Sequence, residues 1–450
     1  MQKVNTKSIE SFANDPIAKV VIKNSIPALI AMVMVMVMVY NLADTFFIGL
    51  TGDDLQVAAV SLASPVFMIF MSLGTLFGVG GSSVISRALG AQKSDYAKKA
   101  SSFCFWASVA LGVVFTVLIW VFLDDLMMML GASENTIEYA GSYLRIAVGC
   151  GAFSMVSNCL SNVIRTEGEP MKAMTGTLIG NLLNVILDPI MILALGWGIT
   201  GAAVATVIGN VVSALYYLAY FFKGNTSLSI RLKDFSMKNR IATDVISIGI
   251  SASLVNILAS VTAIIANGQL VKYGDMFVAG YGVTSKVLMI ITLFGIGVGS
   301  GVQPLFGYCY GAKNKKRLME AIKFSTIFAL ALCIVAAILC FVFAGPIVDI
   351  FLTDAVAYEK GIEFTRILMS TAWLIGAFAI CQNTLQAMGA AVPALLASII
   401  RQAVIFIPAM FILQNIFGAN GLIWAQPVAD VLSLVVVAMM LAAKIGKMES

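Results

Sequence analysis

Seven ionisable side chains lie inside long apolar stretches of this sequence, where a charge is costly. At the centre of a membrane-spanning helix, each one costs about 2.5–3.5 kcal/mol on insertion scales. Such a residue therefore needs a charged partner, a water-filled cavity or a function. The seven are Asp44, Arg145, Asp188, Lys286, Arg366, Arg401 and Asp430.

Amide side chains accompany the first two aspartates. Asn184 precedes Asp188 by four residues and Asn41 precedes Asp44 by three, so on a helix each amide shares a face with its carboxylate. Thr206, on the next apolar run, is expected at a similar depth. We therefore predict a polar pocket whose cation-coupling residues are Asp44, Asp188, Asn184 and Thr206. Further candidates for its lining or for a substrate cavity are Tyr40, Asn41, Asn181, Lys286, Arg401 and Asp430.

Such a pocket could couple transport to a cation gradient. Burial favours the neutral form of a carboxyl group, and a second carboxylate nearby adds to this effect. The pair could then load and release a proton. Carboxylate, amide and hydroxyl oxygens also suit Na+, so a sodium site at Asp44 and Asp188 stays open, with no other metal site expected. The alternative is structural: Asp44 would reach the outer interface, and Asp188 would cap a kink at Pro189.

The charged residues late in the chain suggest a different arrangement. Arg401 and Asp430 fall near mid-membrane on neighbouring runs, which favours a buried ion pair that neutralises itself, although a place in the transport path stays open. Lys286 has no evident sequence partner and could line a central path or reach Asp430. Two arginines near the outer ends of their runs are expected to pair with nearby glutamates or to reach the interface, Arg145 near Glu138 and Arg366 near Glu363.

Twelve apolar runs carry these residues. Of the 450 residues, 60% are hydrophobic and 11% are charged, against about 25% charged in soluble domains. Each run is long enough to cross the roughly 30 Å hydrocarbon core as a helix, and lipid cannot satisfy an open sheet edge. The runs lie near 20–48, 55–83, 100–123, 138–163, 172–195, 200–222, 242–271, 277–304, 321–345, 361–386, 393–416 and 420–443. We expect an all-α integral membrane protein, with Pro27 in the first span as a candidate hinge.

The sequence contains an internal repeat. Residues 54–100 recur without a gap 221 residues later, with 13 identities in 47 positions. Because each half has an even number of runs, both insert the same way up, and their pseudo-two-fold axis should follow the membrane normal. We predict two six-helix lobes, 1–222 and 241–450, joined by a cytoplasmic linker loop at 223–240. Two-copy membrane chains are common among secondary transporters.

Charge and composition exclude several other classes. The net charge of +5 comes from basic residues in alternate loops, which places both termini in the cytoplasm and gives no nucleic-acid footprint. The sequence has no histidine, and its seven cysteines form no CxxC pair, so we expect neither His-based metal sites nor disulfides. Nucleotide-binding and hydrolase motifs are missing. We therefore expect no enzyme and no cofactor.

Several segments together resemble the multidrug and toxic compound extrusion (MATE) family. They are 43–49 (ADTFFIG), 165–170 (RTEGEP), 184–189 (NVILDP) and 198–203 (GITGAA), and the resemblance extends from about Pro27 to Ala443. The Asp188-Pro189 element is similar to the DinF-like branch. That branch implies coupling through N-lobe acids, here Asp44 and Asp188 with Asn184 and Thr206. The other main bacterial branch uses acids in the seventh and tenth spans, and here the tenth carries only Glu363 near its outer end.

The resemblance implies alternating access and export of bulky organic cations in exchange for H+ or Na+. We expect a multi-pass protein of the bacterial cytoplasmic membrane, in contact with lipids and monomeric. The alternative within the same superfamily is a flippase for lipid-linked oligosaccharides, for which Lys286 and Arg401 could hold a pyrophosphate. An intramembrane enzyme or receptor is weakly supported, because a nucleophile–base constellation and a sizeable extramembrane domain are both missing.

Overall fold

The computed structural model describes residues 6–39, 42–129, 136–224, 226–352 and 354–448. Within these residues the secondary structure is helical, with no strand. Contacts divide the chain into two units. Unit 1 comprises Met1–Asn14 and Ile30–Gly249, and unit 2 comprises Asp15–Leu29 and Ile250–Ser450. The bounds of these units differ from those of the predicted lobes, 1–222 and 241–450. The lobe bounds stay a prediction.

Two helices change units along their length. They are α2 (Ile17–Val39) and α11 (Ile241–Leu270). The change in α2 falls between Leu29 and Ile30, three residues after Pro27, and α2 is helical on both sides of this proline.

The remaining helices belong to one unit each. Unit 1 holds α1 (Thr6–Asn14), α3 (Leu42–Gly49), α4 (Asp54–Gly90), α5 (Ser94–Val121), α6 (Leu123–Met129), α7 (Ile137–Gly149), α8 (Gly151–Arg165), α9 (Pro170–Asp188), η1 (Pro189–Ala194), α10 (Gly198–Phe222) and η2 (Leu232–Asp234). Unit 2 holds η3 (Val271–Tyr273), α12 (Asp275–Gly311), α13 (Lys315–Val342), α14 (Ala344–Asp349), α15 (Ala355–Ala372), α16 (Leu374–Ala387), α17 (Ala391–Ile399), η4 (Ile400–Phe406) and α18 (Ile407–Gly446).

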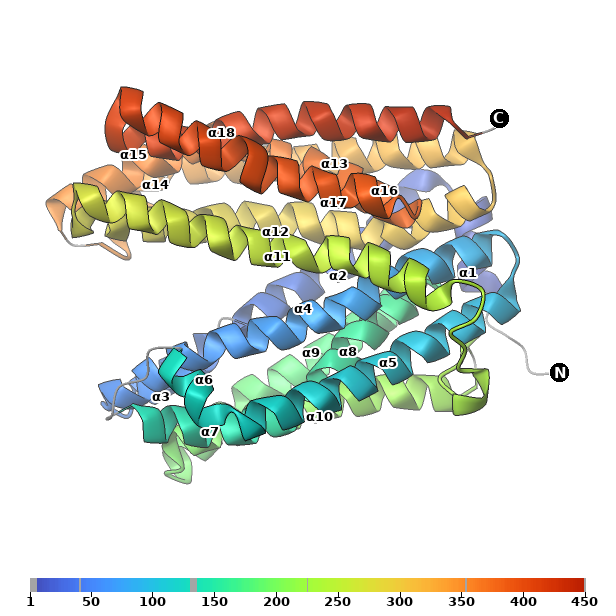
Figure 1. Cartoon of the computed structure of the whole chain (residues 1–450), viewed down its shortest axis with the longest axis horizontal. Coiled ribbons are helices and arrows are strands. Elements are labelled where there is room, and N and C mark those ends of the chain that lie inside the picture. The colour runs from blue at the N-terminus through green and yellow to red at the C-terminus, as the bar shows by residue number, and fades with distance from the viewer. Residues whose placement is uncertain (1–5, 40–41, 130–135, 225, 353, 449–450) are drawn as a thin grey trace. The chain divides into compact units, whose positions relative to one another are not determined.

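The described helices account for twelve spans. Nine segments are long and apolar enough to cross a membrane, and two bent pairs add one span each. The pairs are α7 with α8, bent by 49°, and α15 with α16, bent by 47°. One segment, Ala391–Gly446, has 56 residues and would measure about 84 Å, far more than one crossing needs. Its backbone is non-helical at Gly418 (φ 63°, ψ −141°), where α18 folds back on itself (Figure 1). The twelve-span prediction is confirmed.

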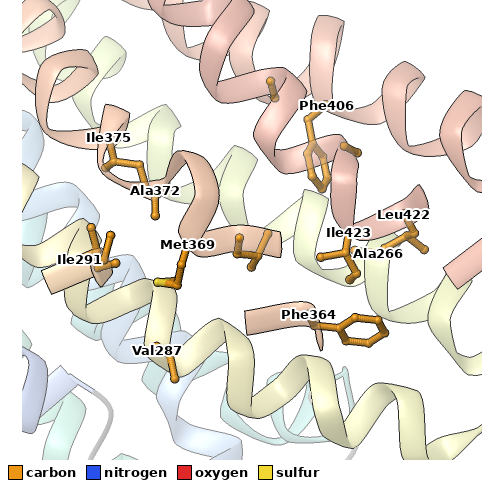
Figure 2. Close-up of a cluster of buried hydrophobic side chains, with 14 of the residues drawn as sticks. Ala266, Val287, Ile291, Phe364, Met369, Ala372, Ile375, Phe406, Leu422 and Ile423 are labelled. Atoms are coloured by element: carbon orange, nitrogen blue, oxygen red, sulfur yellow. The ribbon is translucent and has the colours of Figure 1, made fainter. Parts of the chain in front are cut away.

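Each unit has its own apolar core. In unit 1, Ile48, Phe70 and Tyr143 are among the buried side chains of one cluster. In unit 2, the cluster shown in Figure 2 includes Phe364 and Phe406. Membrane helices gain stability from close packing of this kind rather than from water exclusion alone.

The internal repeat reappears in the packing of glycines. A Cβ atom added to Gly78 would lie 2.8 Å from Asn162 Nδ2. A Cβ atom added to Gly299 would lie 2.6 Å from Asn383 Nδ2, and both members of this pair are displaced by 221 residues from the first. Small residues here let α4 approach α8, and α12 approach α16, in the same way.

The segment that follows α10 packs against unit 1. The buried Glu167 carboxylate accepts hydrogen bonds from the Tyr220 hydroxyl (2.7 Å), the Thr226 hydroxyl (2.6 Å) and the Ser227 backbone N–H (2.6 Å). Further along, the Ser101 hydroxyl donates to the Ser229 carbonyl at 2.8 Å. The sequence pointed to Glu167 only as part of a family segment, and the structure shows that it anchors this loop.

Candidate functional site

Four helices of unit 1 bring their polar side chains together around Asp44. Asp44 lies in the first turn of α3 and is buried. Its Oδ2 accepts a hydrogen bond from the Tyr143 hydroxyl of α7 at 2.7 Å and a longer one from the Thr206 hydroxyl of α10 at 3.3 Å. Hydrogen bonds to a carboxylate are stronger than those between neutral groups, so this contact holds α3 against α7 and α10.

Asn184 connects this cluster to the second carboxyl group. Its Nδ2 donates to Asp188 Oδ1 at 3.2 Å and to Thr206 Oγ1 at 3.3 Å. Asp188 is fully buried at the end of α9, and within the described part of the chain its Oδ2 has no hydrogen-bond partner. Buried polar atoms are nearly always paired, so this oxygen has a free position that can accept a proton or a metal ion.

Local sequence explains why Asp188 points into the cluster. Pro189 cannot donate a backbone hydrogen bond, and the helix continues after Asp188 as the π-helix η1. Single π-helical turns are frequent at functional sites because they redirect side chains. A close crossing of α9 and α10 brings Asn184 within reach of Thr206. A Cβ atom on Gly180 would lie 2.5 Å from the Gly209 carbonyl, so only glycine permits this approach.

Other predicted residues of the first half lie outside this hydrogen-bonded cluster or outside the described residues. Asn181 is buried on α9, and its Nδ2 has no hydrogen-bond partner among the described residues. Tyr40 and Asn41 lie outside the described residues. The sequence did not predict Tyr143 as a site residue, because an aromatic residue 99 positions from Asp44 cannot be distinguished from an ordinary core residue.

Unit 2 holds a buried ion pair, in which Asp430 Oδ2 has no hydrogen-bond partner among the described residues. Arg401 donates to Asp430 Oδ1 from Nε at 3.2 Å and from Nη2 at 2.8 Å, and Gln426 Nε2 donates to the same oxygen at 2.9 Å. The side chains of Arg401 and Asp430 are 15% and 2% exposed. Arg401 lies in the π-helix η4, and its guanidinium stands 4.7 Å from the centre of the Phe378 ring.

The other charged residues within the spans lie apart from both clusters. Lys286 Nζ stands 5.5 Å from the Phe351 ring centre, and the side chains that donate to Asp430 are Arg401 and Gln426. The structure therefore does not bring Lys286 to Asp430. The arginines near the outer ends have partners other than the predicted glutamates, Arg145 pairing with Asp124 at 4.0 Å and Arg366 lying over the Phe341 ring.

Comparison with known proteins identifies the family. The family model MatE matches residues 30–190 and 251–412. The multidrug export protein MepA of Staphylococcus aureus (strain MRSA252) is 32% identical over 419 residues, 93% of this chain and 92% of that protein. The chain belongs to the MATE family. The MepA protein of Staphylococcus haemolyticus (strain JCSC1435) is 31% identical, again over 93% of this chain and 92% of that protein.

Solved structures of MATE transporters match over nearly the whole chain. One, described as an outward-facing multidrug resistance MATE transporter, has a TM-score of 0.92 at 26% identity and covers 99% of each chain. Another, described as MATE in the bent conformation, has a TM-score of 0.90 and covers 98% of each chain. With the family match, they make this chain a multidrug efflux transporter of two six-helix lobes, not an enzyme.

The donor atoms of the first-half cluster suit a small hard cation. Within the described ranges of this MATE chain, no group of three or more His, Cys, Asp or Glu side chains is placed to hold a metal ion. The cluster has two carboxylates, a hydroxyl and an amide. Their oxygens can coordinate Na+, and either carboxylate can bind a proton. Glu363, the acid of the tenth span on α15, lies outside this cluster. It accepts a hydrogen bond from Asn420 and forms an ion pair with Lys360 at 2.6 Å.

Proposed function

We propose that this MATE transporter exports organic cations in exchange for H+ or Na+, and that Asp44 and Asp188 bind the coupling ion. The observation that carries this proposal is the unpartnered Asp188 Oδ2 beside the Asp44 cluster. Two neighbouring carboxylates in a low-dielectric interior cannot both stay charged without a cation. Binding and release of that cation therefore change the charge of the cluster.

The arrangement of α3 supports a link between ion binding and movement. Asp44 is bonded to α7 through Tyr143 and to α10 through Thr206, so neutralising it weakens the contacts that hold the end of the first span. The same span changes units three residues after Pro27. We infer that Pro27 is the hinge at which this span bends during alternating access.

The proposal includes the cellular setting. The multidrug export relatives come from bacteria, which favours the bacterial cytoplasmic membrane, and the alternation of basic and acidic loops favours both termini in the cytoplasm. Inward movement of one proton then releases about 2.3 kcal/mol per 100 mV of membrane potential, and about 1.4 kcal/mol per unit of pH gradient. We propose a monomer, because the coupling cluster is complete within unit 1 of one chain.

The flippase alternative loses one of the two residues that supported it. It rested on Lys286 and Arg401 as ligands for a pyrophosphate. Arg401 is paired with Asp430 and is therefore not available to an anion, whereas Lys286, which lies over the Phe351 ring, keeps its charge. The two relatives compared above are both described as multidrug export proteins.

Transport in proteoliposomes tests the proposal. Efflux of a cationic dye is measured with a pH gradient alone and then with a Na+ gradient alone. Asp188→Asn and Asp44→Asn should each abolish gradient-driven efflux and keep dye binding. Asp124→Asn, which changes an exposed aspartate of α6, is the matched control and should transport normally. Normal gradient-driven efflux in both cluster variants would refute the coupling role.

A further inference from the structure

A large cavity opens at one end of unit 1. It is wide open to the surface, has a volume of about 560 Å³ and is lined by the first residues of α4, by one face of α7 and by the turn before α10. In Figure 1, α3, α6 and α7 gather at this end of unit 1, opposite α1. The proposed topology makes this the outer end.

Hydrogen bonds fix the wall of the cavity. Gln56 donates from Nε2 to Asp53 Oδ2 at 2.9 Å, and its Oε1 accepts from the Ile199 backbone N–H at 2.8 Å. Gly198 adopts a positive φ of 50°, and a Cβ atom there would lie 2.6 Å from Gln56 Oε1. A glycine at this turn therefore keeps the start of α10 close to the start of α4.

The mouth of the cavity is negatively charged. Glu138 is exposed and lines it, and among the lining residues that the structure describes there is no lysine or arginine. The hydrogen bond from Gln56 holds the pKa of Asp53 below its ordinary value, so Asp53 also stays charged at neutral pH. A cleft lined by one sign of charge raises the local concentration of the opposite ion.

Two helices lead from this cavity to Asp44. Tyr139 lines the cavity, and Tyr143 lies one turn further along α7, about 6 Å away, where it donates to Asp44. Thr200 lines the cavity from α10, and Thr206 lies about 9 Å further along, also donating to Asp44. The side chains buried around this stretch include small ones, Ala140, Ala202 and Ala203.

We propose that this cavity is the entrance through which the coupling cation reaches Asp44 from outside, with the hydroxyls of Tyr143 and Thr206 as the last contacts before the carboxylate. The inference rests on the proposed coupling role of Asp44 and adds a route that lies wholly within unit 1. The groups that contact Asp44 in the described structure are Tyr143, Thr206, Asn184 and Asp188, of which only Tyr143 and Asp188 titrate. Charge at the cavity mouth therefore acts on ion delivery, not on a direct partner of Asp44.

Reversing one charge at the mouth tests the route. Glu138→Lys changes two unit charges, and for a cation in the cavity roughly 10 Å from position 138 this should raise the external concentration for half-maximal transport about fourfold. For protons this is a shift of about 0.6 pH unit. The maximal rate should stay the same. The shift should shrink at high ionic strength, because salt screens exposed charges.

The repeat supplies a matched control. Glu359 stands 221 residues after Glu138 and is also exposed, but it belongs to unit 2. Glu359→Lys makes the same charge change in the corresponding position of the other half, and it should leave half-saturation unchanged. Equal shifts in the two variants, or no shift in either, would overturn the proposed route.

Chemical modification gives a second test that does not alter the fold. Ser142 is exposed and lines the cavity. In Ser142→Cys, a cationic methanethiosulfonate reagent should raise the half-saturating cation concentration, and an anionic reagent should lower it. Labelled parent protein should show neither effect. If Asp188→Asn abolishes coupling while label charge at position 142 has no effect, the coupling site stands and the entrance is wrong.

Discussion

Breaking the ion pair of unit 2 from one side should strongly destabilise the protein. Arg401→Met removes two of the three donors to Asp430 Oδ1 and leaves a carboxylate that is 2% exposed with Gln426 as its remaining donor. Removing one partner of a buried pair costs about 3–5 kcal/mol, because the other charge stays buried and uncompensated. Loss of the contact with Phe378 adds about 0.5–2 kcal/mol.

Replacing both partners should cost much less than replacing one. In Arg401→Met/Asp430→Leu no charge is left buried, and apolar replacement of a buried pair is often neutral or stabilising by about 1–4 kcal/mol. The free energy of unfolding in lipid-detergent micelles, measured for both single variants and the double variant, gives the coupling energy between the two side chains. Arg366→Met, which removes an exposed arginine that lies over an aromatic ring, is the control and should cost under about 1 kcal/mol.

Transport by the double variant decides whether the pair has a further role. If Arg401 and Asp430 only neutralise each other, the double variant, whose stability is restored, should show near-normal dye efflux. A coupling energy near zero would refute the reasoning from burial. Restored stability with lost transport would place the pair in the transport path.

Three further changes test the first-half cluster and its surroundings. Tyr143→Phe removes the 2.7 Å bond to Asp44 and should slow gradient-driven efflux about tenfold, since a bond to a charged group is worth about 1.5–3 kcal/mol; unchanged efflux contradicts this. Gly180→Val should lower the thermal midpoint by several degrees, because its Cβ would press on the Gly209 carbonyl, and scanning calorimetry of the purified protein measures this. Glu167→Ala should expose the segment after α10 to limited proteolysis, because it removes the acceptor for three side chains and a backbone amide.

Local patterns predicted the spans and four of the five residues of the cluster, with Tyr143 as the exception. Apolar runs fix helices because lipid leaves the backbone no other hydrogen-bond partners, and the spacing of Asn184 and Asp188 places them on one face of α9. Tyr143 and the bend between α7 and α8 were not predicted, because they depend on packing between segments far apart in the sequence. The π-helices η1 and η4 left no periodic signal of their own.

The two halves repeat the same turn but use it differently. Gly198 and Gly418 both adopt a positive φ before the sixth span of their half, at a spacing of 220 residues. At that spacing Thr206 corresponds to Gln426, and each donates to an aspartate. In unit 2 the aspartate is Asp430, and Arg401 permanently supplies the positive charge that neutralises it.

This comparison explains why coupling would fall to one half alone. The first-half cluster has two carboxyl groups and, among the donors described for it, only neutral hydroxyl and amide groups. Its positive charge must therefore come from outside the chain, and a charge that comes from outside can also leave. The guanidinium of Arg401 is part of the chain and cannot leave, so we propose that the second half keeps the repeated architecture without an ion to exchange.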